Sequence, residues 1–364
     1  MLTQFKTWIE INKKSLENNV KVFRNILGSR TKLMAVVKSN AYGHGLLVFS
    51  KLANELGVDG FCVDSVIEGE KLRDAGIKKP ILVLGFTLPN LFQIAKDKNI
   101  IITISNLESL RVWIKSKHKP QIHLKIDTGM HRQGFYPEDL KKLINHKTHI
   151  KTFCTGVYTH FASAKDINYP TFTDKQFKEF KIACGILEKL GFRNLIKHMG
   201  ATGATLINKK YHLDWVRIGI GLYGLWPSRE LEMQLGNQIK LKPILSWKTI
   251  ISEIKLLKEG DFVGYDLVHR VRVSAKLAVL PIGYWHGMPR SLSDIGEVLV
   301  NGKIAKILGR ISMDMMVVDV TNIKCGVYDE VTLIGNATYL AEKSGTNHYE
   351  FLTRLNPLIE RKVV

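Results

Sequence analysis

A lysine closes the first apolar run of the sequence, in the segment AVVKSNAYGHG over residues 35–45. Lysine is costly to bury, so a lysine at the end of an apolar strand either extends its amine to the surface or has a chemical task. A lysine amine that is kept neutral can attack a carbonyl carbon and can also act as a base. Lys38 is therefore either a surface cation or a reactive amine.

Further polar residues follow other apolar runs in the first 225 residues. Any one of them has an ordinary structural interpretation, such as a strand-end histidine or a surface cation. If the runs are parallel strands of one barrel, their carboxyl ends share one face, and their polar side chains converge there. Six residues stand at or just after such ends: Lys38, Lys125, Arg132, His160, Thr202 and Arg217.

The elements that must position these residues follow an alternating pattern. Short β-branched runs alternate with segments of helical spacing that end on glycine, such as SVIEGEKLRDAG. This pattern predicts a parallel (β/α)8 barrel over residues 1–235, and it leaves an open doubly wound sheet as the alternative. The eight runs begin at Leu33, Gly60, Ile81, Ile100, Ile122, Phe153, Leu195 and Leu213.

The expected secondary structure changes from about residue 236, where strand-like segments follow one another and are joined by turns. Val300-Asn301-Gly302-Lys303 has the signature of a hairpin, because Asn-Gly tolerates the positive φ values of a type I′ turn. We therefore predict an α/β protein in which the barrel is followed by a mostly β domain over residues 236–364.

Composition excludes several classes of function. The 364 residues carry a net charge of +20, but the lysines are spread along the chain without interleaved aromatic residues, which argues against nucleic-acid binding. No run of about 18 uncharged apolar residues is present, so we expect no membrane association and a cytoplasmic location. The four cysteines form no CxxC pair, which argues against disulfides and against a zinc site or other metal.

Eight motifs in order resemble those of alanine racemases, which are fold-type III enzymes that use pyridoxal 5′-phosphate. They are AVVKSNAYGHG, HLKIDTGMHRQGF, GVYTHFA, HMGATGA, VRIGIGLYG, VGYD, LPIGYWHG and GRISMDM, and they span nearly the whole chain. The resemblance implies that Lys38 carries the cofactor as a Schiff base and acts as one base. Tyr265 is implied as the second base, on the opposite face of the substrate carbon. The cofactor supplies the electron sink that the weakly acidic α-proton needs.

The resemblance also assigns the residues around the cofactor. Arg217 is implied opposite the pyridine nitrogen, where a guanidinium can donate a hydrogen bond but cannot leave the ring protonated. His160 is implied to stack on the ring and to link Arg217 to the tyrosine. The phosphate is assigned to Tyr42, Thr202 and the backbone amides of Gly219 and Ile220.

Substrate binding is implied for two residues, with three others in support. Arg132 matches an arginine that pairs with the substrate carboxylate, and Met313 matches a residue that offers its backbone N–H to it. Lys125 matches a lysine that is often carbamylated in the family and orients this arginine. Asp314 is implied to support the Met313 loop, and Tyr284 is implied at the entrance.

Several positions depart from the family pattern, including Ala201, which stands where the family has an asparagine. His131 replaces a glycine, Lys165 precedes a shifted acidic residue, Trp285 and His286 stand beside Tyr284, and Pro357 replaces a tyrosine that helps to hold the phosphate. The catalytic pair is kept, so we expect interconversion of L- and D-alanine that supplies D-alanine for peptidoglycan. The altered entrance keeps open a serine or broad-specificity racemase.

Two more distant alternatives remain. One is a non-catalytic cofactor-binding protein of this fold, which would usually lack the β domain and its tyrosine, and the other is a fold-type III decarboxylase. Such an enzyme typically places an acid rather than an arginine opposite the ring nitrogen. The resemblance further implies a head-to-tail homodimer, in which each barrel receives Tyr265 and Met313 from its partner's β domain.

Overall fold

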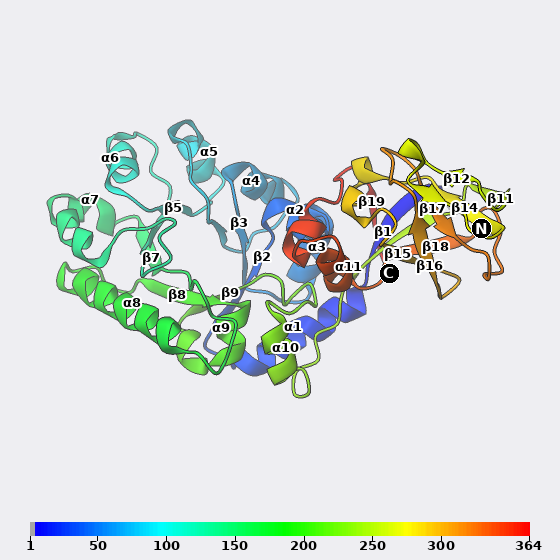
Figure 1. The fold of residues 1–364 in the computed structure, drawn as a ribbon. Helices are drawn as coiled ribbons and strands as arrows, with labels where there is room; N and C mark the ends of the chain where they lie inside the picture. Colours follow the sequence, from blue (N-terminus) through cyan, green and yellow to red (C-terminus); the bar gives the residue numbers. More distant parts are fainter. Residues whose placement is uncertain (1–3) are drawn as a thin grey trace. The chain divides into compact units, whose positions relative to one another are not determined.

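The computed structural model describes residues 4–364, without the side chains of Asn145, His146, Lys147 and His149. It divides into two compact units. The barrel unit comprises Lys14–Ala41 and Phe49–Pro243. The β unit comprises the N-terminal segment up to Lys13, the short stretch Tyr42–Val48, and Ile244–Val364. Figure 1 labels the elements of both units.

Within the described residues, the barrel unit contains a sheet of eight parallel strands in the order β4-β3-β2-β9-β8-β7-β6-β5. A bridge between Leu82 and Ile101 joins its two outer strands, β4 and β5, so the sheet closes on itself. The predicted (β/α)8 barrel is therefore confirmed. Its strands are β2 (Lys32–Val36), β3 (Gly60–Val63), β4 (Ile81–Val83), β5 (Ile102–Ile104), β6 (Ile122–Lys125), β7 (Cys154–Tyr158), β8 (Ile196–Ala201) and β9 (Trp215–Ile218).

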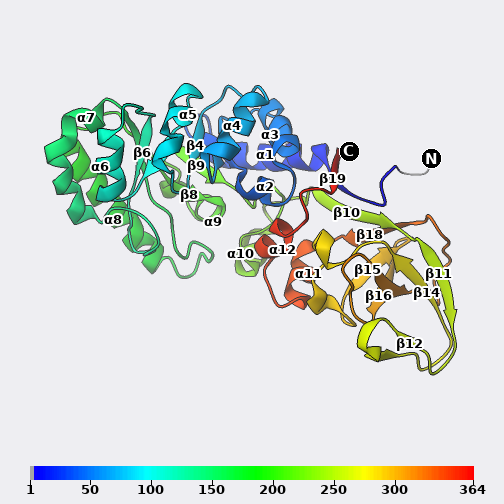
Figure 2. The same ribbon diagram turned by 90° about the horizontal axis from the view of Figure 1, so that it is seen from above.

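Helices lie outside these strands (Figures 1 and 2). Polar caps begin several of them: the side chains of Ser65 and Asn106 accept hydrogen bonds from the amides of Glu68 and Ser109. The elements are α1 (Lys13–Leu27), α3 (Leu46–Glu55), α4 (Val66–Asp74), η1 (Pro89–Leu91), α5 (Phe92–Asp97), α6 (Leu107–Lys115), η2 (Pro137–His146), α7 (Lys147–Lys151), α8 (Thr171–Lys189), α9 (Thr202–Ile207), η3 (Lys209–Tyr211) and α10 (Arg229–Leu235).

The turn after β2 has an unusual backbone. The segment labelled α2 (Lys38–Tyr42) is left-handed, with φ between 51° and 55° from Ser39 to Tyr42. This conformation costs roughly 1–2 kcal/mol per non-glycine residue. The amide of Ser39 donates to Glu68 Oε1 at 2.8 Å and that of Ala41 to the Val37 carbonyl at 2.8 Å. Lys38 therefore begins a strained turn two residues beyond the end of β2.

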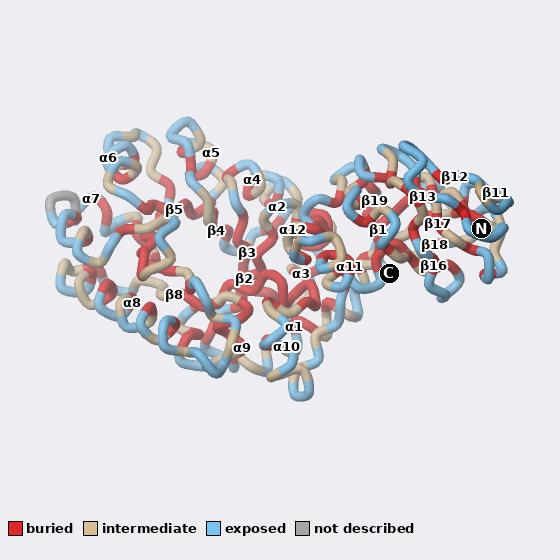
Figure 3. Tube along the Cα trace, viewed as in Figure 1, coloured by how far each residue is buried: buried red, intermediate tan, exposed pale blue. Residues whose placement is uncertain are grey.

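The burial of the barrel strands explains why they could be recognised in the sequence as apolar segments. Every residue of β3, β4, β5, β6 and β9 is buried, and Figure 3 shows buried segments along the barrel strands. A parallel sheet covered on both faces requires such continuous apolar strands. Over residues 4–364, no helix combines the length and the apolarity needed to cross a membrane.

The β unit is built on a nine-stranded sheet in the order β11-β14-β17-β16-β15-β18-β10-β1-β19, counted over the described residues. The first strand of the chain belongs to this sheet, although the sequence analysis counted its residues with the barrel. The strands are β1 (Thr7–Ile11), β10 (Leu245–Ile250), β11 (Glu253–Leu257), β14 (Ala275–Leu280), β15 (Glu297–Val300), β16 (Lys303–Leu308), β17 (Met316–Asp319), β18 (Glu330–Ile334) and β19 (Glu360–Val363).

The predicted hairpin at Asn301-Gly302 is confirmed. Val300 pairs with Lys303 across β15 and β16, and the two turn residues have φ values of 48° and 75°. The remaining elements of the unit are β12 (Phe262–Val263), η4 (Tyr265–Leu267), β13 (His269–Arg270), η5 (Tyr284–His286), η6 (Arg290–Leu292), α11 (Ala337–Lys343) and α12 (His348–Thr353).

Candidate functional site

Cations gather at the carboxyl end of the barrel strands. Lys125, the last residue of β6, is buried, and burial followed by the charge of Arg132 lowers its pKa to about 8. Arg217 and Lys38 lower the pKa of this amine further, whereas Asp127 acts in the opposite direction. Three further cations thus lie close enough to Lys125 to lower its pKa, and a single carboxylate acts against them on this amine. Such a cluster is suited to binding an anion.

Arg217 on β9 is a buried member of this cluster. Its Nη1 donates to His198 Nδ1 at 2.6 Å, and its Nη2 donates to the carbonyl oxygen of Thr159 at 2.8 Å. Nη2 also lies 3.3 Å from both His160 Nδ1 and the Met199 carbonyl oxygen. None of these four bonds uses Nε, so Nε–H is available to donate to a further acceptor.

His160 follows β7 and faces the same cations. Burial, and then the charge of Arg217, holds its pKa well below the usual range. Because the imidazole is neutral, its Nδ1 can accept from Arg217 while its face stays uncharged. A neutral aromatic ring beside a cluster of cations is suited to stacking on a flat ligand.

Thr202 and the loop after β9 form a second part of the site. The hydroxyl of Thr202, the first residue of α9, accepts a hydrogen bond from the Gly221 amide at 3.3 Å. A Cβ atom at Gly221 would lie 2.8 Å from Thr202 Cγ2 and 2.5 Å from Phe23 Cζ, so this position requires glycine. Gly219 and Ile220 precede it and are buried.

Sequence reasoning missed the residues that hold this loop in place. Asn19 on α1 is buried and donates to the carbonyl oxygens of Leu222 at 3.2 Å and Lys242 at 2.8 Å. Phe23, one turn further along α1, packs against Gly221. The repeated glycines of IGIGLYG were the available signal for a close approach; nothing marked Asn19.

Arg132 lies on a loop that one carboxylate organises. Asp127 Oδ1 accepts from the amides of Gly129, Met130 and His131 at 2.9–3.1 Å. His131 has a φ of 53°, which explains why glycine suits this position. The side chain of Arg132 is exposed, and Lys125 Nζ donates to Gln133 Oε1 at 3.1 Å.

Tyr265 lies on the β unit, in the turn between β12 and β13. Gly264 and Asp266 on either side have φ values of 74° and 62°, and the tyrosine side chain is 68% exposed. Leu267 and Val268 beside it are also exposed. This turn therefore presents three exposed side chains with large apolar surfaces.

The loops of Met313 and Tyr284 meet on the same unit. The amides of Tyr284 and Trp285 donate to the carbonyl oxygens of Ser312 at 3.0 Å and Met313 at 3.1 Å. His286 is buried, and its Nδ1 lies 4.0 Å from Asp314 Oδ1. Trp285 is exposed beside Tyr284, whereas His286 lies in the interior of the unit.

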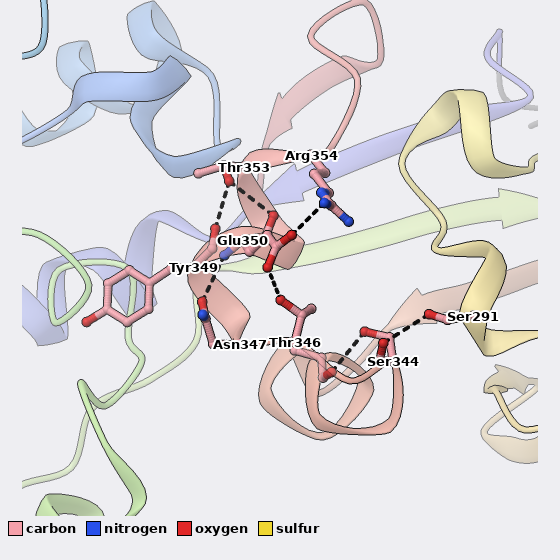
Figure 4. A network of polar contacts seen from close by, with 9 residues as sticks. Ser291, Ser344, Thr346, Asn347, Tyr349, Glu350, Thr353 and Arg354 are labelled. Atoms are coloured by element: carbon pink, nitrogen blue, oxygen red, sulfur yellow. Dashed lines mark hydrogen bonds and ion pairs between the residues drawn. The ribbon is translucent and has the colours of Figure 1, made fainter.

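Tyr42 also falls in the β unit, where its ring centroid lies 6.1 Å from that of Tyr349 on α12. In Figure 4 the Tyr349 side chain points away from a polar network around Glu350. Glu350 donates its amide to the Asn347 cap and lies 2.5 Å from Arg354. Burial, and then the charge of Tyr42, raises the pKa of Tyr349. No pattern in the sequence pointed to Tyr349. Pro357, one of the positions that depart from the family pattern, is exposed.

The predicted site residues thus form two groups. The barrel unit brings together Lys38, Lys125, Arg132, His160 and Arg217, with Thr202, Gly219 and Ile220 on the loops after β8 and β9. The β unit carries Tyr42, Tyr265, Tyr284, Met313 and Asp314. Lys165 is an exposed residue of the barrel unit.

Comparisons with known proteins agree with this arrangement. Residues 11–227 match the family model of the alanine racemase N-terminal domain, and residues 244–363 match that of the C-terminal domain. The chain belongs to the alanine racemase family. The family resemblance seen in the motifs is thereby confirmed. Members of this family are racemases, a class of isomerase, and the chain is an enzyme of this class.

Individual alanine racemases are similar over their full length. A curated alanine racemase of Leptospira interrogans is 38% identical, covering 100% of this chain and 97% of that protein. One of Halothermothrix orenii is 39% identical, with coverage of 98% and 96%. The crystal structure of alanine racemase from Bacillus anthracis with bound L-Ala-P has a TM-score of 0.92 and 33% identity, covering 100% of this chain and 96% of that one.

Proposed function

We propose that this protein interconverts L- and D-alanine with pyridoxal 5′-phosphate held by Lys38. The observation that carries the proposal is the grouping of Lys38 with Arg217, a buried arginine whose four hydrogen bonds leave Nε–H unused. When bound, the cofactor supplies the electron sink that makes the α-proton of an amino acid removable.

The donor set fits an anionic, flat cofactor. Lys38 would hold it covalently, Arg217 Nε–H would donate to its ring nitrogen, and the neutral His160 would face its ring. The Thr202 hydroxyl and the amides of Gly219 and Ile220 would hold the phosphate, with Tyr42 contributing its hydroxyl. The tight fit of Gly221 against Thr202 supports this assignment, because the missing side chain lets the backbone of this loop lie close to the Thr202 hydroxyl, and backbone amides can bind an anion.

Two bases would move the proton at the substrate α-carbon. The amine of Lys38 would remove the α-proton of D-alanine from one face of the α-carbon. The phenolic oxygen of Tyr265 would remove the α-proton of L-alanine from the opposite face. Arg132 would pair with the substrate carboxylate, Lys125 would orient that arginine, and the Met313 amide would bind the same carboxylate.

The working form would be a homodimer with shared sites. Tyr265, Leu267, Val268 and Met313 are exposed on the β unit, which leaves apolar side chains for a partner to cover. In the proposed twofold dimer, each barrel receives Tyr265 and Met313 from the partner chain. The protein would act in the cytoplasm and supply D-alanine for peptidoglycan.

The test combines chemistry and labelling. Purified protein with cofactor is given a panel of amino acids in heavy water, and the products are separated by chiral chromatography. We expect alanine to racemise fastest and both enantiomers to gain α-deuterium. Borohydride should fix the cofactor on Lys38, as shown by peptide mapping. Serine reacting faster than alanine would favour the broad-specificity alternative, and release of carbon dioxide would favour a decarboxylase.

A further inference from the structure

Two buried histidines continue inward from Arg217. His198 on β8 and His123 on β6 are both fully buried, and His123 Nδ1 lies 2.9 Å from His198 Nε2. The other nitrogen of His198, Nδ1, lies 2.6 Å from Arg217 Nη1. The three side chains therefore form one linear chain of hydrogen bonds across three barrel strands. The family motifs contain both histidines, but nothing so far gives His123 a role.

The direction of every hydrogen bond in this chain follows from the donors present. A guanidinium has only N–H donors, so His198 Nδ1 must accept from Arg217. Burial is the main cause that lowers the pKa of both histidines, to about 3 for His123, so each ring carries one proton. His198 therefore has its proton on Nε2 and donates it to His123 Nδ1. His123 in turn has its proton on Nε2.

The surroundings of His123 favour this single arrangement. Its Nε2 is buried and has no hydrogen-bond partner among the described residues. A Cβ atom on Gly156 would lie 2.5–2.8 Å from the ring, so the neighbouring strand must present glycine there. The His123 ring also packs 5.4 Å from that of Trp215, between centroids. Nδ1 is therefore the ring nitrogen through which His123 makes its hydrogen bond, to His198.

We propose that His123 is a positioning residue, which accepts the Nε2 proton of His198 and thereby fixes the tautomer of His198 that orients Arg217. His198 with its proton on Nδ1 would turn a donor toward the guanidinium and displace it. This proposal rests on the proposed function in one respect: the hydrogen bond that Arg217 Nε–H donates is taken to go to the cofactor ring. The histidine chain itself is a property of the barrel unit.

Two variants separate the hydrogen bond from packing. His123→Asn places an amide oxygen where Nδ1 accepts, whereas His123→Leu fills the space without an acceptor. We expect His123→Leu to lower kcat for alanine about tenfold with little change in KM, from the loss of one positioning hydrogen bond. His123→Asn should stay within about twofold of the parent enzyme. Equal activity of the two variants, whether high or low, would overturn the proposal.

A second measurement does not depend on activity. In cofactor-free protein with ¹⁵N-labelled histidine, NMR should show His198 with its proton on Nε2 in the parent chain and in His123→Asn. In His123→Leu the same proton should exchange faster with water. A His198 proton on Nδ1 in the parent chain would overturn the proposal even if the leucine variant fails to fold. If the histidine chain is present but no amino acid racemises, the proposed function fails instead.

Discussion

His269 Nδ1 lies 2.9 Å from Asp294 Oδ1, and the same oxygen accepts the amide of Gly309 at 2.7 Å. This carboxylate therefore fastens the end of the Tyr265 turn to the segment that leads to Met313. Arg310 Nε lies 2.8 Å from Asp266 Oδ2 on the other side of the turn, as an ion pair whose N–H does not align as a hydrogen bond. These contacts thus join the Tyr265 turn to the segment that leads to Met313.

Replacing Asp294 should test this coupling. Asp294→Ala removes both accepted contacts and places alanine at a φ of 61°, so we expect about 1–3 kcal/mol lower stability and a clear loss of racemase activity. Asp294→Asn keeps an accepting oxygen and tolerates this φ, so it should lose much less. Urea unfolding and alanine kinetics measure the two effects. Full activity in Asp294→Ala would show that Tyr265 does not depend on this contact.

Tyr265→Phe should remove the base that serves L-alanine. Positioned acid–base groups contribute about 10²–10⁴-fold, so racemisation should slow by that order. The equilibrium constant cannot change, so the asymmetry must be read from α-deuterium isotope effects measured in each direction. Tyr339→Phe is the control, because it deletes another tyrosine hydroxyl of the β unit, one that donates to Glu297. Unchanged isotope effects in Tyr265→Phe would exclude it as a base.

Mixing two inactive variants should restore activity if the sites are shared. In a twofold dimer of Lys38→Ala and Tyr265→Ala chains, one site has both bases and the other has neither. Random pairing makes about half of the dimers mixed, so about a quarter of all sites should recover. Subunit exchange is followed by native mass spectrometry. Proven exchange without recovered activity would reject the shared-site dimer, as would a fully active monomer.

Lys125 should react with carbon dioxide more readily than an ordinary lysine. Its pKa of about 8 leaves about a tenth of the amine neutral at pH 7, and the neutral fraction rises with pH. The neutral amine adds carbon dioxide and releases a proton to form a carbamate. We therefore expect a ¹³C carbamate signal in labelled bicarbonate that grows between pH 7 and 8. Lys125→Arg keeps the charge but cannot react, so a signal that persists in this variant comes from another residue.

Much of the fold was predictable because most residues of the barrel strands are buried, in five of the strands along the whole length. Runs such as the one ending at Val36 therefore stand out as apolar segments, and their order in the chain matches their order in the sheet. The hairpin at Asn301-Gly302 was equally legible, since its φ values restrict the residues allowed. The strand Thr7–Ile11 was not assigned, because its partners in the sheet lie far along the chain and local pattern cannot reveal them.

Only part of the candidate site was predictable from the sequence. Strand ends located Lys38, Lys125, His160 and Arg217 on one face, and the family motifs supplied their roles. The supporting residues could not be found in this way. Asn19 acts through backbone carbonyls that any residue offers, and His123 acts through a histidine on a neighbouring strand. Neither relationship leaves a pattern in the local sequence.

The place of β1 in the β unit has a consequence for how the chain folds during its synthesis. Thr7–Ile11 pairs with Leu245–Ile250 on one side and with Glu360–Val363 on the other. All strands of the barrel are synthesised before either of these partner strands, so the first strand stays unpaired until after the last barrel strand has been made. The sheet is completed only when Glu360–Val363 has emerged, because this edge strand pairs with Thr7–Ile11, which is made more than 300 residues earlier. Loss of Glu360–Val363 would therefore expose the edge of Thr7–Ile11.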